Sequence, residues 1–263
     1  MLDIWRAMRD EGRMSLRFRN LCCVLVACLG FLSTSLLGEP GQQVASSFVA
    51  AVNRPIGYDY LLYLPEDYSP QGKDWPLLLF LHGAGERGSD LNKVKVHGPP
   101  KLIEAGKSFP FIVVSPQCPT GEIWDAEALL RLITSVENQY RVDASRIYVT
   151  GLSMGGFGTW SLVGRAPERF AAAAPICGGG NFIELALTSE AKKAALKSLP
   201  IWVFHGGADG VVAPEESRRL VQLLGRSSDE IKLTVYPGVG HDSWTATYDN
   251  PALYEWFLNR SRD

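Results

Sequence analysis

A serine stands between glycines at residues 151–156, where the sequence reads Gly-Leu-Ser-Met-Gly-Gly. The residues before this motif, 147–150, have the composition of a β-strand, and those after it predict a helix. A serine hydroxyl is a weak nucleophile unless it is exposed and loses its proton, and a tight strand-to-helix turn exposes it. Such a turn leaves little room for side chains at Gly151 and Gly155. The pattern predicts that Ser153 is the nucleophile of an acyl-transfer reaction.

A nucleophilic serine needs a base, and the chain contains four histidines, at positions 82, 97, 205 and 241. In serine enzymes with this turn, the acid and then the histidine follow the serine along the chain. Only His205 and His241 lie after Ser153, and only His241 leaves a carboxylate at the end of a predicted strand before it. We therefore expect His241 to be the base, and His82 and His205 to hold loops in place.

The base needs a carboxylate to fix its tautomer and stabilise its charged form. Asp209 follows the predicted strand at residues 201–204 on a glycine-rich turn, where its side chain can be directed along the strand ends. Asp242 is the alternative, but a residue next to His241 is poorly placed to reach the Nδ1 atom of its own neighbour. We predict Asp209 as the acid.

The oxyanion of a tetrahedral intermediate needs hydrogen-bond donors. The backbone N–H of Met154, the residue after the nucleophile, is one candidate, because it also begins a helix. The turn His82-Gly83-Ala84 follows the apolar run at residues 77–81, and its Ala84 N–H is the second candidate. An ordinary glycine-rich turn is the alternative interpretation. Glu86 and Arg87 are expected to brace this loop, with contact to substrate as the alternative.

Strand-like and helix-like segments alternate after residue 40, as in a mostly parallel sheet with helices on both faces. The segment at residues 178–199 contains a glycine-rich turn and one helix-like stretch, which is too short for a separate cap domain. We therefore predict an α/β-hydrolase fold with an open site and no large cap. The expected strands are 47–52 and 58–64 (an antiparallel pair), 77–81, 111–115, 147–150, 171–176, 201–204 and 231–236. The expected helices are 125–140, 154–163, 189–196, 214–224 and 251–258.

Three tryptophans, Trp124, Trp160 and Trp244, lie near the predicted catalytic segments in the sequence. Trp124 and Trp244 are expected to line the cleft and contact substrate, with packing in the core as the alternative. For Trp160, core packing is the favoured interpretation.

Composition limits the partners and the location of the protein. The 263 residues carry a formal charge of −2, and lysine and arginine are scattered through the body of the chain, which argues against nucleic acid. Residues 1–38 combine arginines with an apolar run, the pattern of a secretory signal. A lipoprotein attached through Cys28 or an uncleaved membrane anchor would also fit, and these are the expected membrane contacts. We expect an exported catalytic domain at residues 42–263.

Cys118 and Cys177 are the cysteines of the predicted catalytic domain. Two cysteines do not make a disulfide framework, so two separate buried thiols are the favoured interpretation. The chain shows no CxxC motif and no histidine pair typical of a metal site.

The motifs taken together resemble small bacterial esterases of the α/β-hydrolase superfamily. These proteins are often described as predicted peptidases or phospholipase/carboxylesterase-like proteins, and they are similar to feruloyl and acetyl-xylan esterases. The resemblance rests on segments 79–88, 115–119, 151–156, 175–179 and 240–244. It implies the same catalytic and oxyanion residues, no cofactor, and ester substrates that are small molecules or polysaccharides.

We therefore predict a serine esterase that acts through an acyl-enzyme on short acyl esters or on acyl groups of polysaccharides. A serine peptidase that uses the same residues is one alternative. An inactive binding or surface protein of the same fold is the other.

Overall fold

The computed structural model describes residues 40–51, 55–225 and 230–262. The segment that resembles a secretory signal, residues 1–38, and its Cys28 lie outside the described residues.

The described chain forms an eight-stranded sheet in the order β1-β2-β4-β3-β5-β6-β7-β8. β2 pairs antiparallel with both β1 and β4, and the remaining neighbours pair in parallel. The mostly parallel sheet predicted from the sequence is therefore confirmed. The strands are β1 Gln43–Ala51, β2 Pro55–Tyr63, β3 Trp75–Leu81, β4 Ile112–Pro116, β5 Val142–Leu152, β6 Ala172–Ile176, β7 Ile201–Gly206 and β8 Ile231–Tyr236.

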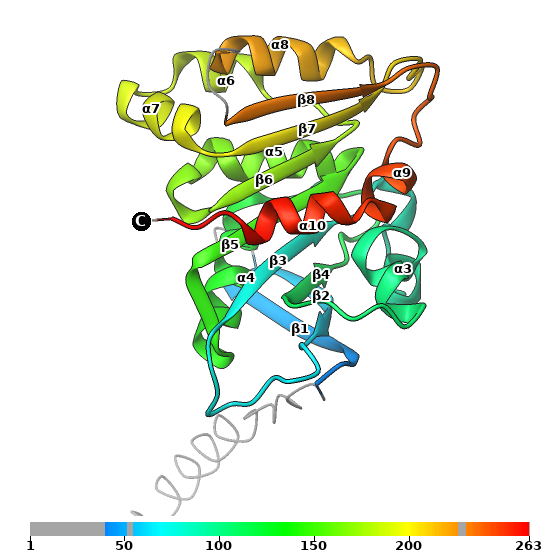
Figure 1. Cartoon of the computed structure of the whole chain (residues 1–263), viewed down its shortest axis with the longest axis vertical. Coiled ribbons are helices and arrows are strands. Elements are labelled where there is room, and N and C mark those ends of the chain that lie inside the picture. Colours follow the sequence, from blue (N-terminus) through cyan, green and yellow to red (C-terminus); the bar gives the residue numbers. More distant parts are fainter. Residues whose placement is uncertain (1–39, 52–54, 226–229, 263) are drawn as a thin grey trace, which may run out of the picture. The chain divides into compact units, whose positions relative to one another are not determined.

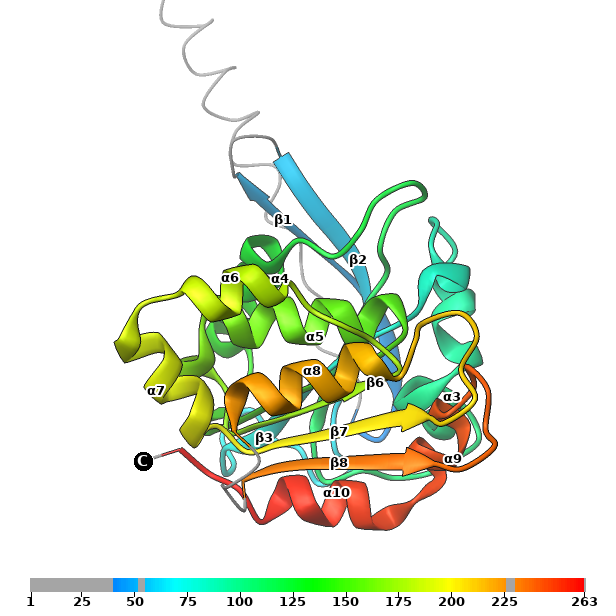
Figure 2. The ribbon, with the colours of Figure 1, turned by 90° about the horizontal axis from the view of Figure 1, so that it is seen from above.

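Helices cover both faces of this sheet (Figures 1 and 2). α4, α5 and α8 pack on one face, and α10 lies on the other. The helices are α3 Gly98–Glu104, α4 Ala126–Gln139, α5 Met154–Arg165, α6 Phe182–Leu187, α7 Glu190–Ser198, α8 Glu215–Leu224, α9 Trp244–Asp249 and α10 Pro251–Leu258, with short 3₁₀ turns η1 Ala84–Glu86, η2 Leu91–Val96 and η3 Pro167–Arg169.

β3 shows why the central strands read as continuous apolar runs. Every residue of this strand is buried. Leu77 and Leu79 point into the core shared with α4 and α5, whereas Leu78 and Phe80 point into the core shared with α10. Because successive side chains of a strand alternate between faces, a strand covered on both sides needs an apolar residue at every position.

Three helices were not predicted: α3, α6 and α9. α3 begins with Gly98-Pro99-Pro100, which resembles a loop in sequence. Proline is compatible with the first turn of a helix, where its missing N–H has no intrahelical partner. α6 and α9 have six residues each, too few to show a helical period.

The connection between β6 and β7 contains α6 and α7 alone, so the site carries no large cap domain, as predicted.

The turn between β5 and α5 is the tightest backbone approach in this part of the fold. Gly151 pairs with Leu81 in the sheet. A Cβ atom at Gly155 would lie 1.9 Å from the carbonyl oxygen of Leu81, and one at Gly151 would lie 2.4 Å from the carbonyl oxygen of Gly155. Backbone atoms of a central strand cannot move aside, so these positions require glycine.

Gly155→Ala should lower the free energy of unfolding by about 3 kcal/mol or more, because the new methyl group meets backbone that is fixed in the sheet. Urea unfolding of the purified variant measures this loss. Gly85→Ala is the matched control, since a Cβ there meets nothing within 4 Å. Equal stabilities of the two variants would contradict the packing argument.

Candidate active site

Ser153 occupies a strained backbone conformation at the turn between β5 and α5. Its φ is +51° and its ψ is −115°. Among the described residues other than glycine, Ser153 and Cys177 have positive φ. The Ser153 N–H donates to the carbonyl oxygen of Ile176 on the neighbouring strand at 2.9 Å, which holds the turn against β6. Strain of this kind persists where surrounding structure fixes it, and it clusters at functional sites.

The structure brings Ser153, His241 and Asp209 into one hydrogen-bonded chain. His241 Nε2 lies 2.9 Å from Ser153 Oγ, and His241 Nδ1 lies 2.7 Å from Asp209 Oδ2. An ionised carboxylate only accepts hydrogen bonds, so Nδ1 carries the proton and Nε2 is left to accept the serine hydroxyl. This is the tautomer in which an imidazole can take a proton from serine.

The carboxylate of Asp209 is held in its charged form. Burial raises its pKa, but hydrogen bonds from His241 and from the backbone N–H groups of Val212 and Val211 outweigh burial and bring the pKa below the ordinary value. The two backbone bonds reach Oδ1 at 3.0 and 2.9 Å and leave Oδ2 directed at His241. The acid therefore has a fixed orientation and a stable negative charge.

His205 supports the loop that carries Asp209. Its Nε2 donates to the carbonyl oxygen of Val212 at 3.0 Å and lies 3.2 Å from Asp209 Oδ2. Its Nδ1 lies 2.7 Å from Ser217 Oγ, and the Ser217 hydroxyl donates to the Gly178 carbonyl oxygen at 3.3 Å. The ring is fully buried and both nitrogens are used, as expected for a histidine that holds a loop.

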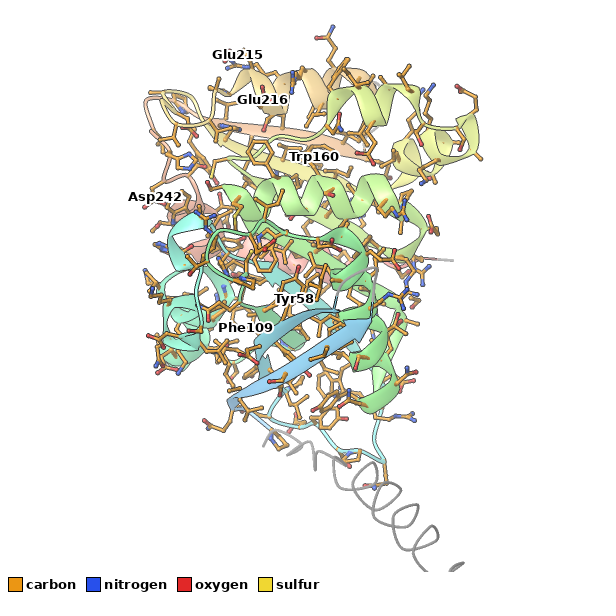
Figure 3. All side chains as sticks on the ribbon, turned by 180° about the vertical axis from the view of Figure 1, so that it is seen from behind. Tyr58, Phe109, Trp160, Glu215, Glu216 and Asp242 are labelled. Atoms are coloured by element: carbon orange, nitrogen blue, oxygen red, sulfur yellow. The ribbon has the colours of Figure 1, made fainter. Side chains whose placement is uncertain are left out.

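Asp242, the alternative acid, has a different partner. Its carboxylate accepts hydrogen bonds from the backbone N–H and the hydroxyl of Thr245, at 3.0 and 2.9 Å. The side chain is exposed at the outside of the molecule (Figure 3). These bonds use the Asp242 carboxylate at the start of α9. The Nδ1 atom of His241 contacts Asp209 instead.

The two candidate oxyanion donors each begin a helical turn beside Ser153. Met154 is the first residue of α5, and Ala84 is the first residue of η1. Glu86 accepts the Gly83 N–H at 2.9 Å, which fixes the peptide between His82 and Gly83. Arg87 donates through Nε to the Ala84 carbonyl oxygen at 3.0 Å, so both charged residues brace this loop.

His82 fixes the same loop through hydrogen bonds of both ring nitrogens. Its Nε2 accepts the Cys118 N–H at 3.0 Å, and its Nδ1 donates to the Gly83 carbonyl oxygen at 2.6 Å. The bond from Cys118 requires an unprotonated Nε2 and therefore the neutral ring. Burial lowers the pKa of His82 to about 4, so the ring stays neutral at physiological pH.

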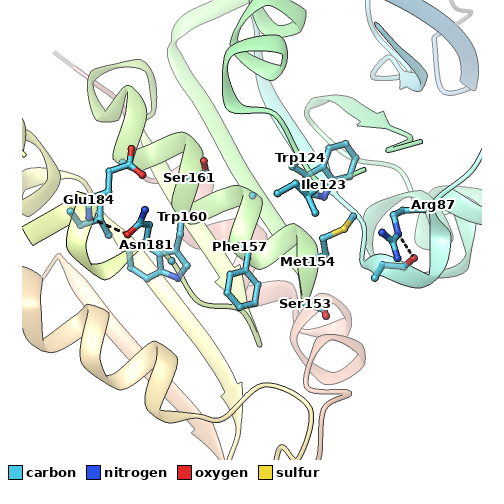
Figure 4. Close-up of a pocket in the computed structure, with 15 residues that line it drawn as sticks. Arg87, Ile123, Trp124, Ser153, Met154, Phe157, Trp160, Ser161, Asn181 and Glu184 are labelled. Carbon is cyan, nitrogen blue, oxygen red and sulfur yellow. Dashed lines mark hydrogen bonds between the residues drawn. The ribbon is translucent and has the colours of Figure 1, made fainter. Parts of the chain in front are cut away.

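A cavity of about 520 Å³ opens beside Ser153. Ala84, Met154 and Trp124 line it, together with residues that the sequence did not single out (Figure 4). Phe157 and Ser161 follow Ser153 at helical spacing, and this spacing is the signal that could have identified them. Arg87, which was expected to brace its loop, also lines the cavity, and the other lining residues not predicted as part of the site are Ile123, Phe157, Gly158, Ser161, Gly164, Gly180, Asn181, Glu184 and Leu185.

The three tryptophans take different positions. Trp124 is mostly buried and lines the cavity, with its indole N–H donated to the His82 carbonyl oxygen at 3.2 Å. Trp160, on α5, is buried in the core and also lines the cavity (Figures 3 and 4). Trp244 does not line this cavity. Its ring packs edge-on against the His241 ring, with the ring centroids 5.3 Å apart, and its indole N–H donates to His97 Nδ1 at 3.3 Å. Trp244 therefore supports His241 and is not part of the cavity wall.

Cys118 and Cys177 are free and buried, as the sequence indicated. Burial raises the pKa of the Cys118 thiol to about 11 and that of the Cys177 thiol to about 12. Neither thiol forms an appreciable thiolate at neutral pH, so neither is a candidate nucleophile.

Within the described part of the chain, no group of three or more histidine, cysteine, aspartate or glutamate side chains could hold a metal ion. The described helices are also too short or too polar to cross a membrane.

Residues 122–253 match the dienelactone hydrolase family. This match spans half of the chain, and the chain belongs to that family. Together with the sheet order and the Ser153 turn, it defines a protein of the α/β-hydrolase class, which confirms the fold predicted from the sequence.

Individual relatives and similar solved structures include esterases. The chain is 29% identical over 163 residues to a bifunctional acetylxylan esterase/xylanase of Neocallimastix patriciarum, a match that covers 59% of this chain and 22% of the relative. It is 29% identical over 120 residues to a poly(3-hydroxyalkanoate) depolymerase of Paucimonas lemoignei, covering 37% of this chain and 29% of that one. The solved structure of a thermostable esterase superposes with a TM-score of 0.69 at 34% identity, covering 84% of this chain and 63% of that one.

The chain therefore spans less than a third of the length of these two curated relatives.

Lowering the pH should destabilise the protein through His82. The folded pKa is about 4 and the ordinary value is 6.5, so between these values the unfolded chain binds a proton that the folded chain does not. Stability is therefore lost as the pH falls through this window, by about 2 kcal/mol between pH 7 and pH 5. Urea unfolding at both pH values, compared with His82→Gln, isolates this contribution. A variant with the same pH dependence as the wild type would refute it.

Proposed function

We propose that this chain is a serine esterase, a carboxylic-ester hydrolase that works through an acyl-enzyme. The observation that carries the proposal is the hydrogen-bonded chain from Ser153 through His241 to Asp209. The family match and the esterases among the relatives support the choice of ester hydrolysis.

In the first half of the reaction, Ser153 Oγ attacks the ester carbonyl carbon while His241 Nε2 takes the hydroxyl proton. The carboxylate of Asp209 stabilises the resulting imidazolium. The N–H groups of Ala84 and Met154 would stabilise the oxyanion of the tetrahedral intermediate. The C–O bond to the leaving alcohol then breaks, and His241 returns the proton to that alcohol.

In the second half, His241 takes a proton from water, and the hydroxide attacks the acyl-enzyme carbonyl. Collapse of the second intermediate releases the carboxylic acid and restores the proton to Ser153. The reaction consumes one water and needs no oxidant, reductant or cofactor.

The substrates we propose are short acyl esters or acyl groups carried by a polysaccharide. The short β6–β7 connection supports this proposal, because it leaves the site without a cap that would exclude a large carrier. We further propose that the protein is exported through residues 1–38, by cleavage, by lipidation at Cys28 or as an anchored form. The arginines followed by an apolar run support this proposal.

Replacing Ser153 with alanine should lower kcat for p-nitrophenyl butyrate by about 10⁴-fold or more, because no other group can form the acyl-enzyme. A fluorophosphonate probe should label the wild type at Ser153 and leave Ser153→Ala unlabelled. Wild-type rates equal to those of the alanine variant would end the esterase proposal. Cleavage of a peptide library without cleavage of esters would favour a peptidase.

Asp209→Asn should lower kcat by about 10³- to 10⁴-fold, because an amide neither holds the required tautomer nor stabilises the imidazolium. Asp242→Asn is the matched control, since its carboxylate contacts Thr245 instead of His241. The control should keep kcat within about threefold of the wild type. The assignment of the acid would be wrong if the two variants exchanged these effects.

A further inference from the structure

The cavity beside Ser153 continues as a groove along α5. Its lining residues from this helix are Met154, Phe157, Gly158, Trp160, Ser161 and Gly164. Residues three or four apart share one face of a helix, so this set forms a continuous strip. From Met154 to Gly164 the helix advances about 15 Å. The groove is therefore much longer than an acetyl group.

Two glycines let the groove walls approach the helix closely. A Cβ atom at Gly158 would lie 2.8 Å from Cδ1 of Trp124, and one at Gly164 would lie 2.8 Å from Cδ2 of Leu185. Ser161 lies on α5 between these two contacts, and its small side chain is exposed. Figure 4 shows Trp124 on one side of α5 and Asn181 with Glu184 on the other.

The lining beside the nucleophile is mostly apolar, with the Arg87 guanidinium held on the Ala84 and Glu122 carbonyl oxygens, and it is polar farther along. Ile123, Trp124, Met154 and Phe157 surround the end beside Ser153. Ile123 is 72% exposed and Phe157 is 40% exposed, so two large apolar side chains face solvent at this opening. Burying exposed apolar surface stabilises a bound ligand, and binding pockets are typically apolar with a few polar groups.

Two polar side chains mark the other end of the groove. Asn181 Oδ1 accepts the backbone N–H of Glu184 at 3.1 Å, which fixes the side chain at the start of α6. Both residues line the cavity. They are available to a hydrogen-bonding group at the far end of a ligand.

We propose that the site is not confined to the short acyl esters named above: this groove also binds a long, mostly apolar arm of the ester substrate, an alkyl or aryl chain, and Ser161 is the residue that admits it. This inference rests on the proposed ester hydrolysis at Ser153. A side chain larger than serine at position 161 would fill the groove between Trp124 and Leu185 without touching Ser153, His241 or Asp209.

The test is a size series at one exposed position. Ser161→Leu should lower kcat/KM for p-nitrophenyl octanoate at least about tenfold and leave p-nitrophenyl acetate within about twofold. Ser161→Ala is the matched control and should keep both values. Leucine is a better helix former than serine, so the variant should fold, which circular dichroism and urea unfolding check.

A second series varies the other part of the ester, comparing octyl acetate with methyl acetate. A selective loss in the p-nitrophenyl series places the acyl arm in the groove, and a selective loss with octyl acetate places the alcohol arm there. Both results support the groove.

Equal effects of Ser161→Leu on long and short esters, or no effect on either series, would overturn the inference and leave the esterase proposal intact. A wild-type protein that hydrolyses none of these esters would overturn both.

Discussion

The arrangement of the site depends on a place where two stretches of backbone meet with no side chain between them. Gly155 at the start of α5 comes so close to the Leu81 carbonyl oxygen of β3 that a methyl group would overlap it. This contact forces the chain to turn sharply after β5 and holds Ser153 at a positive φ. This conformation is energetically unfavourable, and the pairing of β5 with β3 and β6 offsets its cost.

The partners of Ser153 depend on a second close approach, between the loops that follow β7 and β8. A Cβ atom at Gly206 would lie 2.0 Å from the Gly240 carbonyl oxygen, and the Ala208 N–H donates to Val239 at 2.9 Å. Because neighbouring parallel strands end at the same edge of the sheet, these contacts bring Asp209 and His241 together. The residues around them, His205 and Trp244, use their hydrogen bonds to fix the two loops. In the proposed reaction, little reorganisation would then be needed when charge develops on the imidazole.

Much of this could be predicted from the sequence, because the chemistry imposes local requirements. A glycine two positions on either side of Ser153, between a strand and a helix, defines the turn by itself. The buried strands are recognisable because both faces are covered, so each position is apolar. α3, α6 and α9 escaped prediction because their sequences are too short or too rich in proline and glycine to show a period. Trp244 was expected in the cleft because tryptophan suits both a wall and a support, and the sequence does not tell these apart.

The sequence by itself therefore determined the fold class, the turn that exposes Ser153 and the order in which the acid and the base follow it. These depend on steric limits that act over a few residues. Only the tertiary structure decided that Trp244 packs on His241 instead of lining the cavity, that His82 is a buried neutral support, and that α5 carries a groove at Ser161. Each of these depends on where side chains from distant segments meet, and spacing along the chain does not encode that distance.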